Sequence, residues 1–241
     1  MNTKSLVLII TSCLVLALSG CSEDRDTSSS NTKTKSTYTS SSMAGLPEKV
    51  DPALASAGQA VYEQNCIFCH QADAIGKAGF APSLTNQEFL QVVSDKFLMA
   101  TIRDGRKGTG MPPFSHLGRK DVEAIVAYLR SHAKLKNISA EIDAQPQSQG
   151  DERLGRFWFD SICSTCHGRD GNGYAAGGTG TAIGKAAFLD KATDGFIRET
   201  IKKGRSNTRM IGYSGPEAMA NLSNGDVDDI IAYLRTVPSK D

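Results

Sequence analysis

One short segment occurs twice in this chain, and it limits the possible folds more than any other feature. Cys-Ile-Phe-Cys-His at residues 66–70 returns as Cys-Ser-Thr-Cys-His at residues 163–167, which is 97 positions later. Two longer stretches recur at similar offsets: FLMATIRDGR at 97–106 as FIRETIKKGR at 196–205, and DVEAIVAYLR at 121–130 as DVDDIIAYLR at 226–235. The sequence therefore predicts a tandem duplication of a unit of about 85–90 residues.

The repeated Cys-x-x-Cys-His pattern is typical of covalent haem attachment. Positions i, i+3 and i+4 of a helix lie on one face. Cys66 and Cys69 can therefore form thioethers with the two vinyl groups of one porphyrin, and His70 then lies beneath the iron. The second copy supplies the same set: Cys163, Cys166 and His167. We expect two haem c groups, each with its own iron.

Three other uses of these cysteines remain open. The two pairs could form one four-cysteine zinc site, either pair could be a thioredoxin-like redox pair, or disulfides could form after export. The trailing histidine in both copies, and the separate repeat that holds each pair, favour haem over zinc. A thioredoxin-like pair is disfavoured because no βαβ pattern surrounds either copy.

A methionine would complete the first iron site. Met111 lies in Gly-Thr-Gly-Met-Pro-Pro-Phe at residues 108–114. Glycine lets a backbone turn closely, and proline stiffens the chain after the sulfur. A thioether at the sixth position gives a closed electron-transfer site. Met99 lies on a predicted helix instead, and we interpret it as a core residue.

The second unit offers two candidate methionines, Met210 and Met219. Met210 follows Gly204-Arg205 by the interval at which Met111 follows Gly105-Arg106, so the spacing favours Met210. No proline follows Met210, which indicates a looser loop and a more easily displaced iron–sulfur bond.

Each unit is predicted to contain three or four helices. Asp51-Pro52 begins the first helix, because proline is tolerated at the first helical position. Ser94 caps a helix over residues 96–103, and Gly105 ends it. The second unit repeats these signals with Thr193-Asp194, a helix over 196–203, and Gly204.

The last helix of each unit has a clear apolar face with helical spacing. Its members are Val122, Ile125, Val126 and Leu129 in the first unit, and Val227, Ile230, Ile231 and Leu234 in the second. A unit of this size is marginal on its own core, so a bound porphyrin would add needed apolar area. We predict an all-α fold: two tandem domains, each with three to four helices around a haem.

The pattern of residues 1–20 predicts an export leader. The apolar stretch 6–18 is shorter than the roughly 20 residues of a spanning helix and suits a signal peptide. Leu18-Ser19-Gly20-Cys21 resembles a bacterial lipobox, and the resemblance implies cleavage before Cys21 and a lipid on its sulfur. Several acyl chains anchor a protein stably. The leader and the lipid together imply a place on the periplasmic side of a bacterial membrane. Ser22 favours the outer membrane, because an aspartate after the cysteine resembles a signal for retention in the inner membrane.

Composition sets the remaining boundaries. Residues 21–50 hold the lipidated cysteine and a serine- and threonine-rich tether that cannot form a core. The first domain is expected at 51–137, a polar linker at 138–150 and the second domain at 151–241. A formal net charge of +1 implies no large basic surface, so nucleic acid is not an expected partner.

Both units resemble class I cytochromes c over about residues 51–236, and the resemblance implies two tandem cytochrome c-like domains. The attachment segment, the Gly-Arg pair before each methionine and the Ala-Tyr-Leu-Arg helix carry the resemblance. The resemblance implies that Pro82 presents its carbonyl to the Nδ1–H of His70, which fixes the ring and raises its basicity. The second unit departs from the pattern, with Ala182-Ile183 at the comparable place.

The predicted function is electron transfer outside the cytoplasm, in a carrier rather than an enzyme. Partners would be other redox proteins or respiratory complexes, with the membrane reached through the lipid. One alternative is a dihaem redox enzyme, either peroxidase-like, which requires an open iron, or thiosulfate-oxidising, which uses a cysteine ligand that this chain lacks. Another is a subunit of a membrane respiratory complex, since tandem units resemble dihaem oxidase subunits that carry a membrane helix.

Overall fold

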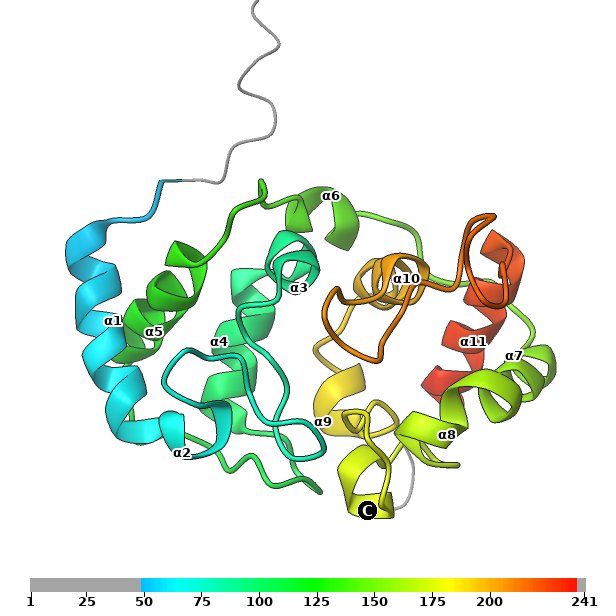
Figure 1. Cartoon of the computed structure of the whole chain (residues 1–241), viewed down its shortest axis with the longest axis horizontal. Coiled ribbons are helices and arrows are strands. Elements are labelled where there is room, and N and C mark those ends of the chain that lie inside the picture. Colours follow the sequence, from blue (N-terminus) through cyan, green and yellow to red (C-terminus); the bar gives the residue numbers. More distant parts are fainter. Residues whose placement is uncertain (1–48, 238–241) are drawn as a thin grey trace, which may run out of the picture. The chain divides into compact units, whose positions relative to one another are not determined.

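The computed structural model describes residues 49–237 as helices joined by loops (Figure 1). No strand occurs within that range, where two isolated bridges pair Lys77 with Ala81 and Gly204 with Ile211. The all-α prediction is confirmed. The predicted leader, Cys21 and the tether up to residue 48 lie outside the described residues.

The helices divide between two halves of the chain, with a short helix between them. The first half, residues 49–137, contains α1 (Pro52–Asn65), α2 (Ile67–His70), α3 (Gln87–Val92), α4 (Asp95–Asp104) and α5 (Arg119–Ser131). The second half, residues 151–237, contains α7 (Glu152–Trp158), a π-helical turn (Phe159–Cys163), α8 (Ser164–His167), a 3₁₀ turn (Gly173–Ala176), α9 (Ala186–Leu189), α10 (Asp194–Lys203) and α11 (Asn224–Thr236). Helix α6 (Ser139–Asp143) lies in the predicted linker.

Local signals set the helix ends. The Asp51 carboxylate accepts from the Ala53 backbone N–H at 2.9 Å at the start of α1. Ser94 Oγ accepts from the Phe97 N–H at the start of α4, and Gly105 with φ +65° ends that helix. The second half repeats both signals with Thr193 and Gly204 at the ends of α10. A side-chain oxygen satisfies one of the unpaired N–H groups of a first helical turn, so these starts are predictable.

The first and last helices of each half pack directly against each other. Helix α1 packs on α5, and α7 packs on α11 (Figure 1). A Cβ built on Gly58 of α1 would lie 1.8 Å from the Ala124 carbonyl oxygen, and one built on Gly155 of α7 would lie 1.8 Å from that of Asp229. Glycine at these two positions therefore allows the helix backbones to touch.

The apolar faces expected on the last helices form the core. All eight predicted residues of α5 and α11 are at most 4% exposed. Tyr62 of α1 is fully buried, stacks on Tyr128 of α5 at 5.1 Å between ring centroids, and donates to the Gln71 carbonyl at 2.7 Å. A buried tyrosine needs such a hydroxyl partner.

One arginine in each half ties the last helix to the turn before the middle helix. Arg130 of α5 donates to the carbonyls of Leu90 at 2.5 Å and Val93 at 2.6 Å, and to the Asp95 carboxylate at 2.8 Å. Arg235 of α11 repeats all three bonds, to Leu189, Ala192 and Asp194. The Arg of Ala-Tyr-Leu-Arg is thus a structural residue.

The two halves meet through aromatic rings within one compact unit of the chain. Phe97 of α4 and Phe196 of α10 lie 5.2 Å apart between ring centroids, and each also contacts a phenylalanine of the other half, Phe188 or Phe89. Helix α6 packs on α10, where a Cβ on Gly195 would lie 1.9 Å from a carbonyl of α6. The predicted linker is therefore a packed segment as well as a connection.

Candidate haem-binding sites

Each attachment segment forms a single helical turn. The N–H groups of Cys69 and His70 both point to the Cys66 carbonyl, at 3.2 Å and 2.9 Å. In the second half the π-helical turn leads into Cys163 and α8. All four of these cysteines are unpaired. The two pairs do not join into one cluster of metal-ligating side chains within residues 49–237.

His70 ends α2 and is 9% exposed. Its Nδ1 lies 3.0 Å from the Pro82 carbonyl oxygen, which is the contact that the resemblance implied. Burial lowers the pKa of His70, against a smaller raising effect from the Pro82 bond, so the imidazole is neutral. A neutral ring that donates from Nδ1 leaves the Nε2 lone pair for a metal. Ligation of iron by His70 stays a prediction.

His167 has a matching partner that sequence reasoning did not identify. Its Nδ1 lies 2.8 Å from the Thr181 carbonyl oxygen, 14 residues along the chain instead of the 12 that separate His70 from its partner. Burial lowers the pKa of His167 too. A Cβ on Gly180 would lie 2.8 Å from the imidazole ring, so glycine lets this loop lie against the histidine. In the sequence, the glycine-rich run before Ala182 was the feature that could have indicated a close approach of this loop to His167.

The two methionine loops have the same hydrogen bonds. The Arg106 N–H donates to the Met111 carbonyl at 2.9 Å, and the Met111 N–H donates to Thr109 Oγ1 at 3.2 Å. In the second half, Arg205, Met210 and Thr208 make the same two bonds at 2.5 Å and 3.0 Å. The second methionine loop therefore forms the same hydrogen bonds although no proline follows Met210.

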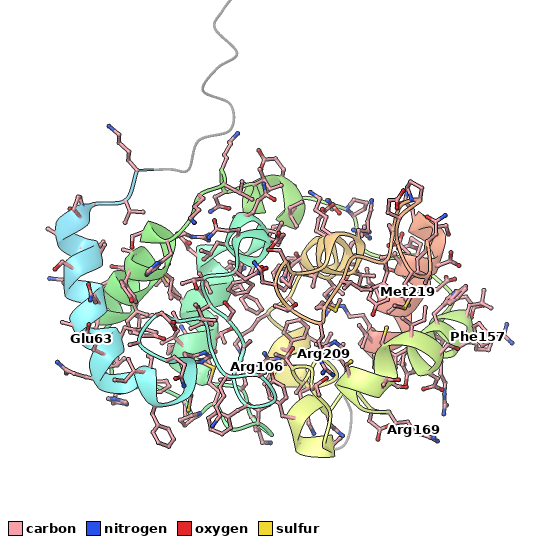
Figure 2. The ribbon with its side chains drawn as sticks, viewed as in Figure 1. Glu63, Arg106, Phe157, Arg169, Arg209 and Met219 are labelled. Carbon is pink, nitrogen blue, oxygen red and sulfur yellow. The ribbon has the colours of Figure 1, made fainter. Side chains whose placement is uncertain are left out.

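Backbone conformation strengthens the match between the loops. Gly108 has φ +77°, and Asn207, at the equivalent position, has φ +58°. Asparagine is one of the few other residues that adopt this region readily. Met210 is partly buried, whereas Met219 is 80% exposed (Figure 2). The geometry makes Met210 the counterpart of Met111, and iron ligation by either stays a prediction.

The methionine loop of the second half also returns to the attachment turn. Burial raises the pKa of Tyr213, and the nearby thiols of Cys163 and Cys166 raise it further. Tyr213 follows Met210 by three residues, so the thioether loop and the attachment cysteines belong to one site. Two thiols, a neutral imidazole and a thioether are the groups that a c-type haem requires.

The described residues contain no segment with both the length and the hydrophobicity of a membrane-spanning helix.

The fold and these paired sites are those of a cytochrome c-type domain, present twice. Two protein-family models agree: "Cytochrome C oxidase, cbb3-type, subunit III" matches residues 53–129, and "Cytochrome c" matches residues 153–238. The chain is accordingly a dihaem c-type cytochrome of class I, and it carries two covalently bound haem c groups. Domains of this kind are electron carriers.

Curated relatives extend the comparison to both halves. The cbb3-type cytochrome c oxidase subunit CcoP of Rubrivivax gelatinosus is 30% identical over 190 residues, covering 76% of this chain and 55% of that protein. CcoP of Rhodobacter capsulatus is 33% identical over 195 residues, covering 78% of this chain and 65% of that protein. The chain thus spans little more than half the length of several CcoP relatives. A solved structure, the Kuenenia stuttgartiensis reducing HAO-like protein complex, aligns with a TM-score of 0.46 at 16% identity, over 80% of this chain and 99% of that one.

Proposed function

We propose that this protein transfers electrons outside the cytoplasm through its two haems, each held between a histidine and a methionine. The observation that carries the proposal is the duplicated pair of loops, one that fixes a neutral histidine and one that presents a methionine. A sixth ligand supplied by the protein leaves no open iron position for a substrate. A closed site of this kind suits a carrier better than a peroxidase-like enzyme.

The proposed site residues follow the repeat. In the domain over residues 51–137, Cys66 and Cys69 hold the haem, His70 and Met111 bind its iron, and Pro82 orients the histidine. In the domain over 151–241, the set is Cys163, Cys166, His167 and Met210. When bound, each iron takes up or releases one electron, while the protein ligands stay in place.

A redox titration followed by visible and near-infrared spectra tests the ligand set. A weak far-red band in the oxidised protein marks iron–methionine ligation. Met111→Ala and Met210→Ala should each remove about half of this band, since each haem then loses one sulfur ligand. Met219→Ala is the matched control and should leave the band intact. Loss of the band in Met219→Ala but not in Met210→Ala would contradict the assignment.

We also propose that the electron partner is a membrane respiratory complex or a redox protein that serves one. Relatives that are similar over both halves are named as subunits of cbb3-type cytochrome c oxidase. Purification of the tagged chain from gently solubilised membranes tests this. A terminal oxidase that co-purifies and accepts electrons from the reduced chain supports a subunit role. A chain that purifies alone yet still reduces an oxidase supports a free carrier.

A lipid on Cys21 is the proposed membrane attachment, on the periplasmic side and in the outer membrane. Cys21→Ser should abolish labelling by a radioactive fatty acid and release the chain from membranes. Cys13→Ser, in the same leader, is the matched control and should retain both properties. Separation of the two membranes by density then locates the anchored chain. Labelling that persists in Cys21→Ser would refute the lipid anchor.

A further inference from the structure

The loop that holds His167 lacks the proline that its counterpart has. In the first half the accepting carbonyl belongs to Pro82, whose ring restricts the backbone. Reciprocal hydrogen bonds between Lys77 and Ala81 brace the same loop at 2.9 Å each. The second half has no proline here, and Gly178 and Gly180 precede Thr181. Glycine adds conformational freedom. Backbone hydrogen bonds hold the loop on either side of Thr181, from the Gly180 N–H to the Cys166 carbonyl and from the Ile183 N–H to the Gly171 carbonyl, at 2.8 Å each. A further restraint would act on the Thr181–Ala182 segment between these two bonds.

An arginine from the other half supplies a restraint at this point. Arg106 lies in the methionine loop of the first half, and its Nη2 donates to the carbonyl of Ala182, the residue after Thr181. Figure 2 labels Arg106 where the two halves face each other. Its guanidinium also lies over the Phe188 ring, 4.9 Å from the ring centroid. These contacts fix a planar cation against the loop of the second half.

The equivalent arginine of the second half acts differently. Arg205 lies over the ring of Phe89, 5.6 Å from the ring centroid, as Arg106 lies over Phe188, but it also lies 5.7 Å from the ring centroid of Phe196 in its own half. Its hydrogen bonds, however, go to Thr200 Oγ1 and to the Gly204 carbonyl within its own half. Among the described residues, therefore, the loop without a proline is the one that receives an arginine from the opposite half.

We propose that Arg106 is a positioning residue for the second haem: by holding the Ala182 carbonyl it keeps the neighbouring Thr181 carbonyl on the Nδ1–H of His167. The inference rests on the proposed ligand role of His167. A hydrogen bond at Nδ1 sets ring orientation and ligand basicity. The second haem's axial ligand consequently depends on a side chain from the domain of the first haem.

Exchange of the histidine ring protons with solvent tests this in the intact, reduced holoprotein. In Arg106→Gln and Arg106→Lys, NMR should detect exchange of the His167 Nδ1–H about tenfold faster, as expected when local opening loses one hydrogen bond. The His70 proton should keep its rate. Lysine keeps the positive charge of arginine, so Arg106→Lys tests the contribution of the planar guanidinium group alone.

Potentials provide a second readout. In Arg106→Lys the midpoint potential of the second haem should rise relative to that of the first, because a weaker Nδ1–H bond makes the imidazole a poorer donor to oxidised iron. Arg205→Lys and Arg205→Gln are matched controls: they disturb the equivalent cation–ring contact but should change neither histidine proton.

Two results would overturn the proposal: an unchanged His167 exchange rate in both Arg106 variants, or equal acceleration in the Arg205 variants. The second result would mean that contact between the halves in general, and not Arg106, protects the histidine. The wild-type protein separates this failure from failure of the proposed function. If the carbon-bound ring protons of His167 lack the large ring-current shift expected for a histidine bound to haem iron, the proposed ligation of the second iron is wrong.

Discussion

Gly58→Ala should destabilise the first half, although alanine is the better helix former. The new Cβ would lie 1.8 Å from the Ala124 carbonyl oxygen, whereas an ordinary contact is 3.4–4 Å. Helices α1 and α5 would have to separate by more than an ångström, which opens the packing around Tyr62. Overpacking costs about 1–3 kcal/mol, and alanine regains about 1 kcal/mol of helix propensity. Because the obstructing atoms belong to the backbone and cannot move aside, we expect an overpacking cost at the upper end of this range and a net loss in unfolding free energy of about 2 kcal/mol.

Denaturant titration of the holoprotein, followed by circular dichroism and by NMR signals of each haem, measures this change half by half. Gly155→Ala, with the same 1.8 Å contact on α11, should weaken the second half by a similar amount. Gly225→Ala is the matched control. Its Cβ would meet nothing nearer than Ser223 Oγ at 3.6 Å, so stability should stay equal or rise by up to about 1 kcal/mol. If Gly58→Ala proves as stable as Gly225→Ala, the close helix crossing is refuted.

Three further predictions concern single contacts. Arg130→Gln should lower the free energy of unfolding of the first half by about 2–3 kcal/mol, chiefly through two unsatisfied carbonyls. Arg103→Gln removes an exposed ion pair and should leave the denaturant midpoint nearly unchanged; equal effects of the two variants in denaturant titrations would contradict this. Gly105→Ala forces φ +65° on alanine, with its Cβ 2.5 Å from backbone, and should weaken the far-red band of the first haem. Burial raises the pKa of the Glu88 carboxylate. The hydrogen bonds that this carboxylate accepts from its own backbone N–H and from Ser206 of the second half outweigh burial and lower its pKa overall. The stability that it contributes is thus present at neutral pH and lost below about pH 4.5, and Glu88→Gln should show a smaller acid-induced loss in unfolding free energy than the wild type.

Much of the fold could be predicted because the signals are local. The caps at Ser94 and Thr193, the glycines that end α4 and α10, and the apolar faces of α5 and α11 depend on residues a few positions apart. The short helices α3, α6 and α9 were missed because four to six residues are too few to show a helical period. With these short helices included, residues 49–137 contain five helices, α1 to α5.

The haem sites also contain local features that the sequence could predict and long-range contacts that it could not. The attachment turn and the Met210 loop follow a repeated local pattern, and the Pro82 contact follows from the family resemblance. The role of Thr181 was missed because its loop has a different length from that of Pro82, and the sequence comparison placed Ala182-Ile183 opposite the proline. The bond from Arg106 to Ala182 joins residues 76 positions apart, and only the fold brings them together.

The paired ring contacts have an evolutionary meaning. Arg106 lies on Phe188 while Arg205 lies on Phe89, and each residue is 99 positions from its counterpart. Equivalent residues thus exchange partners, which is the signature of an isologous interface with a two-fold axis. Such an interface can exist between separate identical subunits. The chain therefore has the architecture of a fused homodimer whose two copies differ, among other places, where the first has Pro82 and the second has no proline.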